Sequence, residues 1–167
     1  MIKPSTRVAQ FYAGQGDYES ALPWYQTCVE TTEAHLGKNH PIVATSLNNL
    51  ALLYRDQGRY AEAEPLLQRS IAIREQHLEA NHPEVAESLN NLASLYELQG
   101  HYTKAEVYYQ QALSVKEQQL GSDHIDVALS LNNLAILYTA QGRYADAEPL
   151  LLRSLSIREQ QLGTEHP

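Results

Sequence analysis

The chain has 167 residues and a formal net charge of −8 at pH 7. This acidic balance argues against nucleic acid, which requires a basic surface, and against docking on an anionic membrane. No apolar run approaches the roughly 20 residues that a membrane-spanning helix needs, and the N-terminal residues show no apolar signal region. The single cysteine, Cys28, cannot form an internal disulfide, so we expect a reducing, cytoplasmic setting.

One unit of 42 residues repeats along the whole chain, and single glycines mark its period at positions 16, 58, 100 and 142. The most regular segment runs from Ser46 to Tyr60 and returns at 88–102 and 130–144. Such units cannot bury their own apolar side, so they stack on their neighbours. We expect one repeat domain with units of roughly 1–40, 41–82, 83–124 and 125–167. Residues 165–167 repeat the opening of a unit, so we interpret the chain as a fragment of a longer array.

The apolar pattern of each unit predicts two helices, helix A followed by helix B. Apolar side chains along helix A of the second unit recur at three- and four-residue steps, which is the spacing of one helix face. They are Val43, Leu47, Leu50, Ala51 and Tyr54. Gly58 is expected to end helix A in a left-handed turn, and the same apolar period then continues as helix B from Tyr60 to about Leu78. The whole chain therefore predicts eight helices.

A histidine recurs once per unit, just before helix A, at His40, His82, His124 and His166. The asparagine, aspartate and proline residues around these histidines are typical of helix starts. Histidines that hold a metal from one helix lie about one turn apart, and a spacing of 42 residues does not produce that geometry. We therefore interpret them as turn residues and expect neither a metal site nor a cofactor.

The interior of each unit is predicted from residue size. Ala51 and Ala63 fall where helices A and B cross, so they must be small, and Tyr54 and Tyr60 are expected to fill the space beside them. Cys28 occupies the place of Ser70 in the next unit and is expected to be a packed, unreactive thiol.

This pattern resembles the tetratricopeptide repeat, whose standard unit has about 34 residues. The Leu-Asn-Asn-Leu-Ala segment at 47–51, the Gln-Gly-Arg-Tyr segment at 57–60 and the Ala-Glu-Pro-Leu segment at 63–66 are similar to the longer repeats of kinesin light chains. Bacterial proteins carry similar arrays. The resemblance covers the whole chain and implies an all-α fold, a right-handed α-solenoid of four tandem helix-turn-helix repeats.

The candidate binding residues lie on the face of helix A that points away from helix B. In a stacked array these faces would line one concave groove. The candidates are Asn48, Leu52, Arg55, Asn90, Ser94, Glu97, Asn132, Ile136 and Thr139. The resemblance implies that Asn48, Asn90 and Asn132 hold a peptide backbone, because an amide both donates and accepts hydrogen bonds. The alternative is that the asparagines bond between adjacent helices and hold the stack.

The function favoured by these patterns is a non-catalytic scaffold that binds a protein or peptide ligand in the groove. No glycine-rich phosphate loop and no recurring set of serine or cysteine with histidine indicates an enzyme. A second hypothesis is structural: near-identical units could stack end to end between molecules and form an assembly element.

Overall fold

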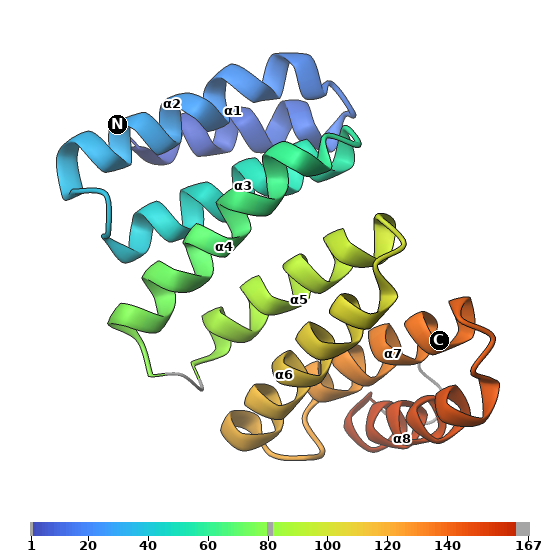
Figure 1. The fold of residues 1–167 in the computed structure, drawn as a ribbon. Coiled ribbons are helices and arrows are strands. Elements are labelled where there is room, and N and C mark those ends of the chain that lie inside the picture. Colours follow the sequence, from blue (N-terminus) through green and yellow to red (C-terminus); the bar gives the residue numbers. More distant parts are fainter. Residues whose placement is uncertain (1, 80–81, 163–167) are drawn as a thin grey trace. The chain divides into compact units, whose positions relative to one another are not determined.

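The computed structural model describes the backbone of residues 2–79 and 82–162, and within them the chain forms α-helices and no β-strand (Figure 1). The described helices are α1 (Ile2–Gly14), α2 (Tyr18–Leu36), α3 (Pro41–Asp56), α4 (Tyr60–His77), α5 (Pro83–Leu98), α6 (Tyr102–Leu120), α7 (Ile125–Ala140) and α8 (Tyr144–Leu162). Odd-numbered helices are the predicted helices A and even-numbered ones the helices B. The predicted all-α fold of helical pairs is confirmed.

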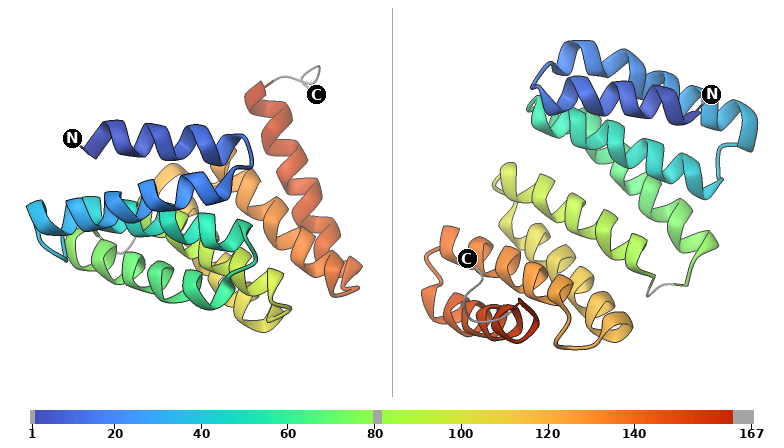
Figure 2. Two further views of the ribbon diagram at one scale, coloured as in Figure 1. Left: turned by 90° about the horizontal axis from the view of Figure 1, so that it is seen from above. Right: turned by 180° about the vertical axis from the view of Figure 1, so that it is seen from behind.

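The chain divides into two compact parts, each larger than one 42-residue repeat. They are called the first unit, Met1–His77 with α1 to α4, and the second unit, Leu78–Pro167 with α5 to α8; from here on the 42-residue segments are called repeats. Within each unit every helix packs against the next one in the chain, as the views of Figure 2 show. No helix in the described ranges combines the length and the apolar character needed to cross a membrane.

The turns from helix A to helix B rely on glycine. Gly58 and Gly142 have φ values of 72° and 74°, in the left-handed region that other residues avoid. This conformation lets the next residue fold back: the Arg59 N–H donates to the Tyr54 carbonyl and the Arg143 N–H to the Tyr138 carbonyl, both at 2.8 Å. The glycine period therefore sets where each helix A ends.

The recurring histidines start helices α3, α5 and α7. His40, His82 and His124 each accept a hydrogen bond through Nδ1 from the backbone N–H two residues later, at 3.2, 3.2 and 3.1 Å. Such a cap satisfies one of the N–H groups that the first helical turn leaves without a partner. The predicted turn role is thus confirmed for these three residues, whereas His166 lies outside the described residues.

The interior of the second unit follows the predicted pattern, and the first unit repeats it. Leu131 of α7 and Ile157 of α8 form a buried cluster, and the Ser154 hydroxyl donates to the Ala128 carbonyl at 2.8 Å. In the first unit Leu47 and Ile73 pack in the same way, and Ser70 donates to Ala44 at 2.8 Å. The serine hydroxyl therefore ties helix B to helix A without leaving a buried polar group unpaired.

The two tyrosine positions of the repeat differ in burial. Tyr54, Tyr96 and Tyr138, near the ends of helices A, are buried as predicted. The second tyrosine is less buried than expected. Tyr60 is half-buried, and the expectation that this position fills the interior is wrong for Tyr102 and Tyr144, which are 37% and 68% exposed. Tyr102 and Tyr144 are the first residues of α6 and α8, so their side chains lie at the rim of the turn instead of between the helices.

Candidate functional site

One face of α7 presents polar and aliphatic side chains together. Its members are Leu129, the adjacent pair Asn132 and Asn133, and Ile136. Each asparagine lies three or four residues from Leu129 and from Ile136, which places the four side chains on one side of the helix. Leu129 is 47% exposed and Ile136 is 51% exposed, while the asparagines are half-buried. The Asn132 amide forms no hydrogen bond within the described residues. This face therefore offers an unused donor and acceptor between two aliphatic contacts.

The matching face of α5 lies beside it. The Asn133 side-chain nitrogen donates to the Asn90 side-chain oxygen at 3.0 Å, so an amide bond joins α7 to α5. The predicted alternative role, in which asparagines hold adjacent helices together, applies to this pair. Asn90 and Ser94 are half-buried.

Glu97 and Thr139 end these two faces. The Glu97 carboxylate accepts a hydrogen bond from the Tyr109 hydroxyl of α6 at 2.8 Å, which holds the charged group in one place. Thr139 is exposed, and its hydroxyl donates to the Ala135 carbonyl of its own helix at 2.8 Å. The α5 and α7 candidates thus form one surface, with a positioned carboxylate at one end.

The first unit presents its three candidates differently. Asn48 on α3 is only 2% exposed. The sequence predicts this amide on an exposed face of helix A, but the structure buries it. Leu52 is half-buried, and Arg55 forms an ion pair with the neighbouring Asp56 at 2.7 Å. The free amide described for Asn132 therefore has no counterpart at Asn48, although the two residues occupy the same place in the repeat.

Sequence reasoning missed a network at the turns. The Tyr138 hydroxyl donates to Glu106 at 2.9 Å and accepts from Gln110 at 3.3 Å, while the Arg143 guanidinium lies 4.0 Å from the ring centre and bonds Glu106 at 2.7 Å. Burial, followed by the hydrogen bond to Glu106, raises the pKa of Tyr138 above its usual value. This network joins α6 to the turn between α7 and α8.

The third repeat also places a cation over its buried tyrosine, Tyr96, but this cation comes from a different position of the repeat. In the fourth repeat Arg143 forms an ion pair with Asp146, whereas the matching places of the third repeat hold His101 and Lys104. There Lys104 lies 4.8 Å from the centre of the Tyr96 ring. The exchange of an arginine–acid pair for a histidine–lysine pair is visible in the sequence and would have revealed the contact.

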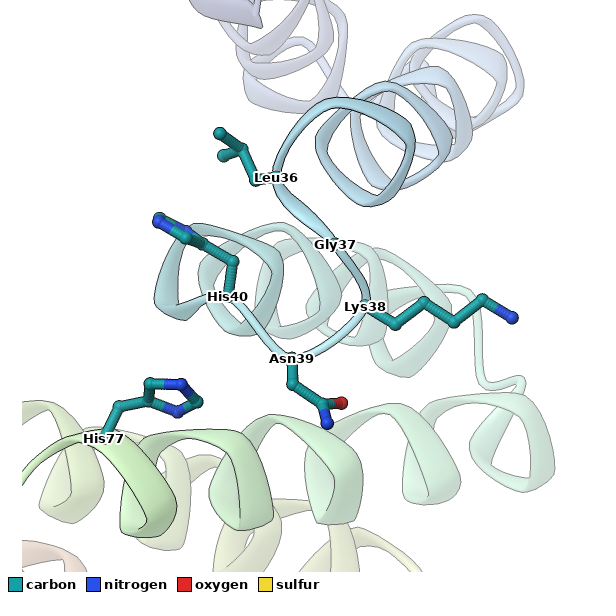
Figure 3. Close-up of a pocket in the computed structure, with 6 residues that line it drawn as sticks. All are labelled: Leu36, Gly37, Lys38, Asn39, His40 and His77. Carbon is teal, nitrogen blue, oxygen red and sulfur yellow. The ribbon is translucent and has the colours of Figure 1, made fainter.

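A cavity of about 370 Å³ lies between the α2–α3 loop and the end of α4 (Figure 3). Its lining residues are Leu36, Gly37, Lys38, Asn39, His40 and His77. His40 already uses Nδ1 to cap α3, and Nδ1 of His77 lies 3.0 Å from the Ile73 carbonyl, to which it donates. Within the described residues no group of three or more histidine, cysteine, aspartate or glutamate side chains could hold a metal ion.

Comparisons with known proteins agree with the repeat architecture. A family model described as tetratricopeptide repeat matches residues 3–76, 47–118 and 84–160. The structure is similar to BtubC (BKLC) from P. vanneervenii, with a TM-score of 0.87 and 23% sequence identity, over 99% of this chain and 66% of that chain. At this identity the likeness concerns the fold alone, and the chain spans less than two thirds of that protein's length.

A crystal structure of a Podosopora anserina putative kinesin light chain with nearly identical TPR-like repeats is also similar. Its TM-score is 0.86 at 28% identity, and the match covers 99% of this chain and 79% of that chain. No curated protein matches the sequence. The chain therefore belongs to the tetratricopeptide repeat family, and its 42-residue units are of the kinesin-light-chain-like type.

Proposed function

We propose that the chain is a non-catalytic module that binds a peptide segment of a partner protein along the exposed faces of its helices A. Tetratricopeptide repeats generally mediate protein–protein interactions. The observation that carries the proposal is the unused amide of Asn132, which lies between the exposed Leu129 and Ile136. An amide can pair with both the N–H and the carbonyl of a peptide bond, so it holds an extended backbone whatever side chains that backbone carries.

The side chains that could carry chemistry support a role without catalysis. The Nδ1 atoms of His40, His82 and His124 are committed to helix caps. Cys28 is buried and its sulfur lies 3.4 Å from the Thr6 hydroxyl, so the thiol is packed as predicted. An unpaired thiol fits a reducing compartment, and a cytoplasmic location remains part of the proposal.

Replacing Asn132 by alanine tests the proposal. We expect the variant to bind a peptide selected on the parent chain about tenfold more weakly, because one backbone hydrogen bond is lost and the peptide group that made it is left unpaired. Isothermal titration calorimetry measures this difference. The stability of the chain should not change, since the Asn132 amide bonds no described residue.

Asn133→Ala is the matched control. It removes an amide from the adjacent position but breaks the bond to Asn90, so it should lower stability and leave peptide affinity less affected. Equal affinity of the parent and the Asn132→Ala variant for the selected peptide would contradict the proposal.

Self-association is a second candidate function, favoured by the exposed face of α8. Leu152 and Leu155 of this helix are 61% and 53% exposed, and Leu151 is exposed too. The places that match Leu151 are Tyr25, Leu67 and Tyr109, and all three are buried. Helices α2 and α6, which hold Tyr25 and Tyr109, pack on the following helix A. A second copy could cover Leu151 and Leu155 by placing its α1 on α8, because the matching places in the internal repeats are buried or half-buried.

Charge opposes this stacking. Glu106 and Glu117 of α6 form ion pairs with Arg143 and Arg153 of the next repeat. On α8 the acids at the matching places are Glu148 and Glu159. In a second copy stacked on α8, the places that correspond to Arg143 and Arg153 hold Asp17 and Thr27, neither of which is a cation. Like charges and missing cations weaken an interface. The first repeat therefore fits α8 less well than an internal repeat fits α6.

Sedimentation equilibrium distinguishes the two candidates. We expect one monomeric mass at all concentrations, because the stacked interface lacks both ion pairs. A mass that rises with concentration, and that falls again in Leu151→Gln, would instead favour the assembly function. Leu152→Gln is the matched control: glutamine stands at the matching places 26, 68 and 110, which stay exposed in the internal repeats, so this variant should leave the mass unchanged.

A further inference from the structure

We infer that the peptide bound by the second unit carries an apolar residue two positions from a lysine or arginine; this inference rests on the proposed function. The relevant surface, the α5–α7 surface, consists of Asn90, Ser94 and Glu97 of α5 with Leu129, Asn132 and Ile136 of α7. Its aliphatic contacts come from α7 and its charge from α5, so one ligand must satisfy both chemistries.

The register of the two helices places the charge beyond the apolar contact. Helix α6 returns between α5 and α7, so these two helices run in the same direction, and the Asn133–Asn90 hydrogen bond fixes their alignment. Ile136 is three residues beyond Asn133, and Glu97 is seven residues beyond Asn90. The difference of four residues corresponds to about 6 Å along the helix axis. An extended peptide covers this length in about two residues.

Glu97 supplies the negative charge at that end. Its carboxylate is held by the Tyr109 hydroxyl at 2.8 Å and forms no ion pair within the described residues. Helix α6 carries two cations, and both face other groups. Lys104 lies 4.8 Å from the centre of the Tyr96 ring, and Lys116 interacts with the acids Asp126 and Glu87, at the starts of α7 and α5. Lys116 therefore compensates the opposite end, and the charge of Glu97 is left for a ligand cation.

Ile136 supplies the apolar contact, and within the second unit no other helix A has an aliphatic residue at this place of the repeat. Ile136 is 51% exposed, and Ser94 occupies the matching place on α5. Leu129, seven residues earlier on the same face of α7, corresponds to the acidic Glu87. Burying an exposed aliphatic side chain against a ligand gains hydrophobic free energy, while a cation beside Glu97 sets the direction of the peptide.

A random peptide library displayed against the full chain tests the inference. We expect the enriched peptides to carry a leucine, isoleucine or aromatic residue two positions from a lysine or arginine. Glu97→Gln keeps an oxygen for Tyr109 but removes the charge, and should weaken binding about fivefold and reduce its salt dependence. Ile136→Ser should weaken binding by a similar or larger factor. Leu155→Ser on α8, where the leucine is 53% exposed, is the matched control and should bind as the parent does.

The outcomes separate this inference from the proposed function. Enriched peptides that are acidic or uncharged, and that lose affinity in Asn132→Ala but not in Glu97→Gln, would overturn the basic–apolar ligand while leaving a peptide-binding module. If no peptide is enriched, the proposed function fails and this inference fails with it.

Discussion

Truncating Leu131 to alanine is expected to lower the free energy of unfolding by about 2–5 kcal/mol. Leu131 is fully buried in the cluster that joins α7 to α8, so the substitution removes apolar contacts and leaves a cavity among rigid neighbours. Urea unfolding followed by circular dichroism measures the loss.

Leu129→Ala is the control for this prediction. Leu129 lies two residues earlier on the same helix but is largely exposed, so its truncation should change stability by no more than about 0.5 kcal/mol. Similar losses for the two variants would contradict the burial pattern that separates the interior of α7 from its exposed face.

Enlarging Ala135 to leucine is expected to destabilise the second unit by about 1–3 kcal/mol. Ala135 is fully buried where α7 packs on α8, and the added atoms would push the two backbones apart. The effect is opposite in origin to that of Leu131→Ala: one site needs its volume and the other cannot accept more.

Ala140→Leu serves as the comparison, because Ala140 is exposed at the end of α7 and a larger side chain there meets solvent. Urea unfolding should show Ala140→Leu close to the parent. A stable, well-folded Ala135→Leu variant would contradict the close approach of the two helices.

The helices, turns and caps could be predicted from the sequence because local residues determine them. Gly58 adopts the left-handed conformation that its place after helix A requires, and His124 caps α7 through its own backbone neighbours. The interior alanines follow from size. The prediction for Tyr144 failed because the apolar period continues into the first residue of α8, where the side chain already lies outside the helix pair.

The composition of the proposed binding surface could be predicted only in part. Asn48, Asn90 and Asn132 share one place in the repeat, yet one is buried, one accepts a bond from Asn133 and one has an unused amide. A helical wheel gives the direction of a side chain on its own helix but not what the neighbouring helices place opposite it. The position of Glu97 beside Tyr109 likewise depends on how α5 packs on α6.

The central claim is that the Asn132 amide holds the backbone of a bound peptide. Nuclear magnetic resonance of the side-chain amide and methyl groups tests it most directly, during titration with a peptide selected on the parent chain. We predict that the Asn132 side-chain signals shift in proportion to bound peptide, together with those of Ile136, while signals from the exposed leucines of α8 stay in place. Saturable binding that leaves the Asn132 signals unchanged and shifts those of α8 would contradict the account.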